Sequence, residues 1–129
     1  MMKLCKFYRY FIYRIYHLSN DIPVIRVLGY LSFMHASHLL CYVFFLSRIL
    51  CVNLIDLGKI EKYIYAIIFL GLHYILFYNK EKWEEYFKEF ENESKEERKK
   101  GTIKVWGYFI GSILIPISII ILVSELFPQ

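Results

Sequence analysis

The sequence predicts an all-α membrane protein: three transmembrane helices, an amphipathic interfacial helix before them, and a cytoplasmic helical hairpin between spans two and three. Two observations support this fold class. Hydrophobic residues make up 57% and aromatic residues 19% of the 129 residues, which is too apolar for an ordinary soluble domain. Residues 27–47, 63–78 and 105–123 contain no charged side chain. A water-soluble bundle would have nothing polar to cover the outer faces of these stretches.

The three uncharged stretches differ in length. A bilayer core about 30 Å thick needs roughly 20 helical residues, so the first and third stretches can cross it directly. The second is short, but Lys62 and Lys80 flank it and can extend their charged ends to the headgroups. We therefore predict spans at 24–48, 60–79 and 103–124, all within one membrane domain that covers residues 1–129.

Residues 1–18 have the pattern of a basic amphipathic helix. Apolar side chains recur there at three- and four-residue spacing: Leu4, Phe7, Phe11, Ile15 and Leu18. Basic side chains such as Lys6 and Arg14 occupy another face and interrupt any signal-peptide core. This pattern favours a helix that lies in the membrane surface. A basic flank of the first span is the alternative.

Lysine and arginine are distributed unevenly between the connections. The segment before the first span and the connection between spans two and three together hold thirteen of them, and the other two segments hold three. By the positive-inside rule, the N-terminus and residues 79–104 lie in the cytoplasm and the C-terminus lies outside.

The segment 80–102 is the sizeable polar region, and the chain must reverse within it. Ser94 and Glu97 form a Ser-x-x-Glu capping box, which predicts that a new helix begins near Lys95. We expect the helix of the second span to continue to about Glu91, so that the two arms form a hairpin. Trp83, Tyr86, Phe87 and Phe90 form an apolar stripe on the first arm. This stripe packs against the second arm or the membrane surface, or it is a docking face for a protein partner.

Four polar residues stand out inside the spans: Ser32, His35, His38 and His73. The depths of the histidines allow the three imidazoles to meet in the cytoplasmic half of the bilayer. Neutral imidazole both donates and accepts a hydrogen bond, so it can join helices without charge. Two other interpretations are the lining of an oligomeric pore or proton path, and metal or haem ligation.

The third span carries Gly107-x-x-x-Gly111, and Ser118 continues the same stripe beyond Leu114. Small residues at this spacing allow helices to approach closely. The pattern fits packing against another span of the same chain and fits self-association equally well.

The stretch "FENESKEERKKGTIKV", followed by an apolar span, resembles a segment of small membrane proteins of Bacteroidetes-type bacteria. In that group an N-terminus rich in Tyr, Arg and Phe also precedes the first span. The group has no established activity, so the resemblance implies a bacterial inner-membrane location and no catalytic residue.

Signatures of enzymes and of metal sites are missing from the sequence. It contains no glycine-rich phosphate loop, no G-x-S-x-G and no H-E-x-x-H, and its three cysteines form no pair with metal-ligand spacing. We therefore expect no cofactor. We also expect no nucleic-acid partner, because anionic lipid is the nearest partner for the basic residues.

We therefore predict a non-enzymatic protein that binds or regulates another membrane component, for example as an immunity or accessory protein of a toxin or defence locus. Its expected partners are the lipid bilayer and a protein partner or a second copy, bound through the transmembrane helices. An oligomeric pore or transport element lined by Ser32, His35 and His38 is the alternative function, and a haem or metal redox subunit is the third.

Overall fold

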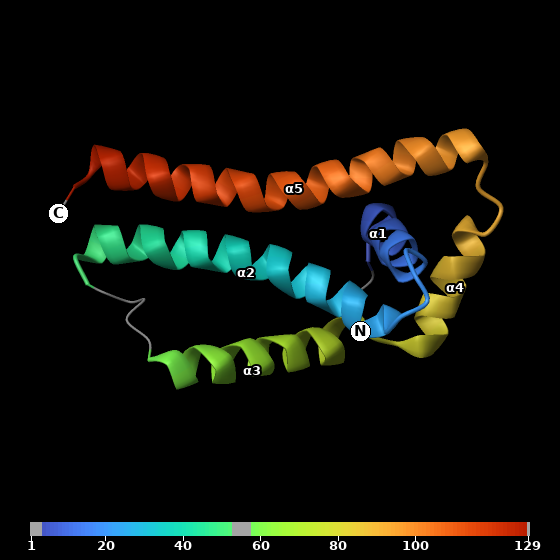
Figure 1. Cartoon of the computed structure of the whole chain (residues 1–129), viewed down its shortest axis with the longest axis horizontal. Coiled ribbons are helices and arrows are strands. Elements are labelled where there is room, and N and C mark those ends of the chain that lie inside the picture. Colours follow the sequence, from blue (N-terminus) through green and yellow to red (C-terminus); the bar gives the residue numbers. More distant parts are fainter. Residues whose placement is uncertain (1–3, 53–57, 129) are drawn as a thin grey trace.

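The computed structural model describes residues 4–52 and 58–128, and this part of the chain folds into five helices. They are α1 (Lys6–Tyr16), α2 (Pro23–Leu50), α3 (Lys59–Phe77), α4 (Lys80–Phe90) and α5 (Lys95–Leu126). Figure 1 shows α2 between α3 and α5, with α1 and α4 gathered at one end of these long helices and the C-terminus at the other. We call the α1 and α4 end the head of the protein.

The helices α2, α3 and α5 are each long and apolar enough to cross a membrane. Within the most apolar window of each, only 11% of the residues are buried inside the protein. Large apolar side chains therefore face outward, as Ile67 and Ile75 of α3 do at 71% and 74% exposure. Water would disfavour such a surface and lipid accommodates it, so the all-helical class and the multi-pass arrangement agree with the sequence prediction.

The hydrophobic core lies in the head. Side chains from all five helices form it: Phe11, Ile12, Ile15, Val27, Leu28, Leu31, Met34, Phe77, Trp83, Tyr86 and Val105. Away from the head, the spans bury few side chains against one another.

Helix α1 is held inside this core. Phe11, Ile12 and Ile15 are at most 1% exposed, because α1 packs against α2, α4 and α5 together. The sequence pattern assigned Phe11 and Ile15 to the apolar face, but Ile12 and Tyr13 are buried as well. The apolar face that we expected to meet lipid is thus covered by protein, and contact of α1 with the membrane surface stays a prediction.

The helix is interrupted between α3 and α4, whereas the sequence predicts one continuous helix to about Glu91. Helix α3 ends at Phe77, and the Asn79 side chain then caps α4 by accepting a hydrogen bond from the Lys82 backbone N–H at 3.0 Å. The Trp83 Nε1–H donates to the Phe77 carbonyl at 2.8 Å, which satisfies one of the free carbonyls at the end of α3. This cap and the buried indole stabilise the break, so the continuous helix was a wrong prediction.

The predicted start of the last helix is confirmed. Ser94 caps α5, its hydroxyl accepting from the Glu97 N–H at 3.2 Å while the Glu97 carboxylate accepts from the Ser94 N–H at 2.8 Å. Helix α5 then continues through Pro116 to Leu126. Within the described residues α4 and α5 do not pack against each other, because α1 lies between them (Figure 1).

Candidate functional site

Two of the predicted intramembrane histidines form a direct pair. The Nδ1 atom of His35 on α2 lies 2.7 Å from Nε2 of His73 on α3, and Nδ1 of His73 lies 2.8 Å from the Phe69 carbonyl oxygen. A carbonyl oxygen only accepts, so His73 carries its proton on Nδ1. In the neutral ring Nε2 then accepts, and His35 Nδ1–H is the donor. In this arrangement neutral imidazoles can join the two helices.

The surroundings of this pair are apolar and aromatic. His73 is 5% exposed, and its ring stacks on Phe77 with centroids 5.4 Å apart. The His35 ring lies 5.6 Å from the same Phe77 ring. A hydrogen bond between helices in such a setting favours one register of α3 against α2, because sliding the helix would leave two polar groups in hydrocarbon.

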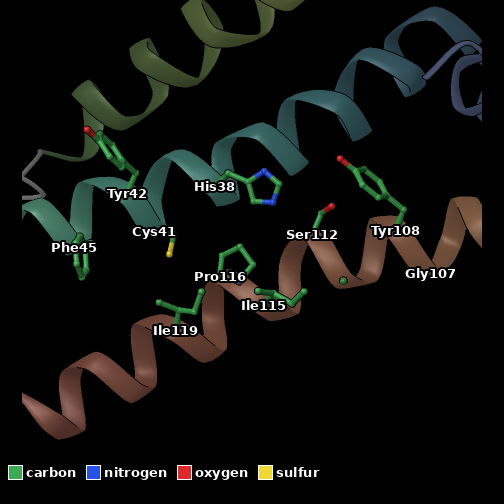
Figure 2. Close-up of a pocket in the computed structure, with 11 residues that line it drawn as sticks. His38, Cys41, Tyr42, Phe45, Gly107, Tyr108, Ser112, Ile115, Pro116 and Ile119 are labelled. Carbon is green, nitrogen blue, oxygen red and sulfur yellow. The ribbon is translucent and has the colours of Figure 1, made fainter. Parts of the chain in front are cut away.

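The other two members of the predicted polar cluster lie apart from this pair. His38 lines a groove between α2 and α5 (Figure 2), whereas His35 contacts His73 on α3. The Ser32 hydroxyl is buried and has no hydrogen-bond partner among the described residues. Within a single chain, His35 and His38 therefore contact different neighbouring helices.

The geometry of the pair also bears on metal binding. Two imidazole nitrogens bound to one tetrahedral metal ion are about 3.3 Å apart, since each bond is about 2 Å long and the angle between the bonds is about 109°. The 2.7 Å separation instead matches a direct hydrogen bond. Within residues 4–52 and 58–128, no three His, Cys, Asp or Glu side chains are placed to hold a metal ion together.

The predicted helix-packing glycines line the groove between α2 and α5, which has a volume of about 630 Å³. A Cβ atom added at Gly107 or Gly111 would meet nothing within 4 Å, so the groove is open in front of both. Within the chain these glycines therefore do not serve close helix contact. Ser118 is exposed, and its hydroxyl donates to the Leu114 carbonyl of its own helix at 2.7 Å. The hollow lined by Gly107 and Gly111 is called the α2–α5 groove below.

The predicted aromatic stripe on α4 packs against α1. Trp83, Tyr86 and Phe90 are 2%, 9% and 8% exposed. Their neighbours are aromatic side chains of α1, such as Tyr16, whose ring lies 4.6 Å from the partly buried Phe87. The stripe thus covers α1 instead of the second arm, and a partner would have to displace α1 to reach its buried rings.

Polar contacts that the sequence did not predict hold α1 in the head. The Arg9 guanidinium donates to both carboxylate oxygens of Glu89 on α4, at 2.8 and 2.9 Å. The Tyr10 hydroxyl donates to Glu93 at 2.8 Å, and Arg14 donates to the Thr102 hydroxyl of α5 at 2.7 Å. The sequence predicts anionic lipid as the nearest partner of the basic residues, whereas these two arginines contact other helices of the protein. The signal for pairing was the acidic run that follows residue 80, since opposite charges on two polar segments can pair with each other as well as with lipid.

These contacts shift two ionisation equilibria in the head. Burial, and then the hydrogen bond to Glu93, raise the pKa of Tyr10 to about 12. The hydrogen bonds from Arg9 lower the pKa of Glu89. Both shifts favour the protonation states present at neutral pH, with Tyr10 as a donor and Glu89 as an anion.

Comparison of the chain with protein-family models, with curated proteins and with solved structures gave no match.

Proposed function

We propose that this chain is a non-enzymatic integral membrane protein that binds or regulates another membrane component through the outer face of α3. The observation that supports the proposal most directly is the sparse packing of α3 within the chain. Of its 19 residues, only His73 and Phe77 are buried. The helix is joined to α2 by the His35–His73 hydrogen bond and leaves its remaining faces free.

The packing of α4 adds to this argument. The sequence predicts partner binding through the intramembrane faces and the cytoplasmic hairpin, and the structure buries most of the α4 stripe of that hairpin against α1. On α3, a Cβ atom added at the exposed Gly71 would meet nothing within 4 Å. A second helix can approach closely at such a position, and van der Waals packing then drives association in lipid.

The proposal includes a location and an orientation. The excess of lysine and arginine in the head segments supports a cytoplasmic N-terminus and an external C-terminus. The resemblance of residues 90–105 supports a bacterial inner membrane. An immunity or accessory protein of a toxin or defence locus is the version of this function that fits a small chain with free intramembrane faces. Fusions of a periplasm-active and a cytoplasm-active reporter to each chain end test the orientation, and equal activity at both ends contradicts it.

Photo-crosslinking along α3 in native membranes tests the binding face. A photoreactive amino acid is placed singly at each position from Ile64 to Ile75, and the yield of crosslinked protein is measured for each. A bound helix produces yields that rise and fall with a period of about 3.6 residues, because it touches one face of α3. The same scan over residues 117–122 of α5 is the matched control.

Uniformly low yields along α3, or yields that the α5 control equals, contradict the proposal, since lipid surrounds all exposed positions alike. A periodic pattern whose crosslinked product has twice the mass of the chain identifies a second copy as the component bound.

A further inference from the structure

A second hollow adjoins the α2–α5 groove at the head. It has a volume of about 710 Å³ and lies between α1, the end of α4 and the beginning of α5. Phe7 borders this hollow and Tyr108 borders the α2–α5 groove, and their ring centroids are 4.8 Å apart. Lys104 precedes Gly107 and Gly111 by one and two helical turns, so the same face of α5 lines both hollows.

The second hollow is lined by three lysines and three glutamates. Arg9 and Arg98 pair with two of these glutamates, so basic side chains outnumber acidic ones at the hollow. Its lysines are Lys6, Lys100 and Lys104, which we call the lysine mouth. Within the described part of the chain, none of them forms an ion pair or a hydrogen bond through its side chain. Two of the three carboxylates beside them pair with arginines: Glu89 accepts from Arg9, and Glu93 accepts from Arg98 and from Tyr10. Glu97 accepts from the Ser94 N–H and keeps its negative charge near Lys6 and Lys100.

The dimensions of the α2–α5 groove match one leaflet. Along α5 it extends from Gly107 to Ile119, which is about 18 Å at about 1.5 Å per residue. Half of a bilayer core is about 15 Å deep. A transmembrane helix would need a face as long as the whole core, whereas an acyl chain occupies one leaflet.

The hydroxyl of a largely buried serine also faces the groove. Ser112 is 7% exposed and lines the groove, and Figure 2 shows its hydroxyl directed into the space between α2 and α5. No hydrogen bond joins its side chain to another described residue. A pure hydrocarbon occupant would leave this group unpaired, while a glycerol ester carbonyl can accept its hydrogen bond.

We propose that the α2–α5 groove and the lysine mouth together bind one anionic phospholipid. Its phosphate contacts the lysine mouth, and one acyl chain lies in the groove in front of the two glycines. Charge complementarity selects the headgroup, because basic pockets beside transmembrane helices attract anionic lipid. This site lies on α5, away from the outer face of α3, so it does not depend on the proposed protein partner.

Lipid titration of the purified full chain in detergent, followed by native mass spectrometry, tests the proposal. The probes are dioleoyl phosphatidylglycerol, dioleoyl phosphatidylcholine and inorganic phosphate. We expect phosphatidylglycerol to bind at least about tenfold more tightly than phosphatidylcholine, and phosphate alone not to compete. The pair Lys100→Gln with Lys104→Gln reduces the phosphatidylglycerol affinity at least about tenfold, and the matched pair Lys95→Gln with Lys99→Gln leaves it within about twofold.

A second variant set tests the acyl-chain half of the site. Gly107→Leu with Gly111→Leu fills the groove and weakens the binding of both lipids, while Gly71→Leu on α3 leaves it unchanged. Circular dichroism checks that each variant is folded. If the groove variant does not fold, the two lysine-pair variants alone test the proposal.

Several outcomes overturn the proposal. Equal affinity for the two lipids contradicts a contact between the phosphate and the lysine mouth. An equal loss of phosphatidylglycerol affinity in both lysine-pair variants indicates general attraction of the lipid to the basic surface. Competition by inorganic phosphate indicates an anion site without a chain. A lipid-free dimer that the groove variant abolishes identifies a helix of a second copy as the occupant.

Discussion

The ring of Tyr10 lies against Gly101, where an added Cβ atom would clash with the tyrosine hydroxyl and ring. Tyr10 cannot simply turn aside, because its hydroxyl donates to Glu93 and its ring packs edge-on against Phe90 with centroids 5.0 Å apart. The position therefore needs a residue without a side chain, and it joins the start of α5 to α1.

We predict that Gly101→Ala destabilises the protein by about 1–3 kcal/mol, although alanine is the better helix former. The methyl group displaces Tyr10 and breaks its hydrogen bond to the Glu93 carboxylate. Thermal unfolding in mild detergent, followed by circular dichroism, measures the effect. Gly71→Ala is the matched control, because its Cβ meets nothing within 4 Å and the substitution is neutral or slightly stabilising. Equal stability of the two variants would show that the contact between Tyr10 and Gly101 contributes nothing to the stability of the fold.

We predict that His35 and His73 are energetically coupled. His35→Leu or His73→Leu alone leaves one imidazole unpaired in the membrane and costs about 1 kcal/mol, as measured for hydrogen bonds between transmembrane helices. The double variant loses less than the sum of the two, because no unpaired ring remains. Resistance to unfolding by denaturing detergent provides the free energies. His38→Leu serves as control, since no hydrogen bond joins His38 to a described residue; strictly additive losses would argue against the pair.

Local features of this chain were predictable, and contacts between distant segments were not. The uncharged stretches and the Ser94–Glu97 cap depend on neighbouring residues alone, and the structure has three long apolar helices and a helix that begins at Lys95. The position of α1 depends on contacts with segments about 80 to 90 residues later, such as Arg9 with the Glu89 carboxylate and Arg14 with the Thr102 hydroxyl. No periodicity within these segments reveals those contacts.

The histidines show the same limit. Helix α2 has a neighbour on each side, so a shift of three residues is enough to turn His38 toward α5 while His35 faces α3. Depth in the membrane indicated which imidazoles could meet, and rotation about α2 decided which of them did. The order of the helices around α2 sets that rotation, and the sequence does not state it.

We predict that Trp83 is shielded from water by α1. The chain has two tryptophans, so in a Trp106→Phe variant the fluorescence reports on Trp83 alone. Its 2% exposure predicts weak quenching by iodide. Tyr16→Ala removes a ring 6.1 Å from the indole and raises the quenching, whereas Tyr63→Ala on the exposed face of α3 leaves it unchanged. Strong quenching without any substitution would mean that the stripe is open for docking.

The Arg9–Glu89 pair makes the stability of the head depend on pH. Because the folded-state pKa of Glu89 lies below the ordinary 4.5, the pair stabilises the protein fully above that pH and is lost as the pH falls through the lowered value. The contribution is less than about 1 kcal/mol, since water reaches both side chains and screens the pair. Glu89→Gln removes this part of the acid sensitivity. The hydrogen bonds to Ser94 also lower the pKa of Glu97, so the acid sensitivity that Glu97 contributes is still present in the variant. Melting temperatures measured from pH 7 to about pH 3.5 should therefore fall more steeply for the natural chain than for Glu89→Gln, and parallel curves would show that the pair adds nothing.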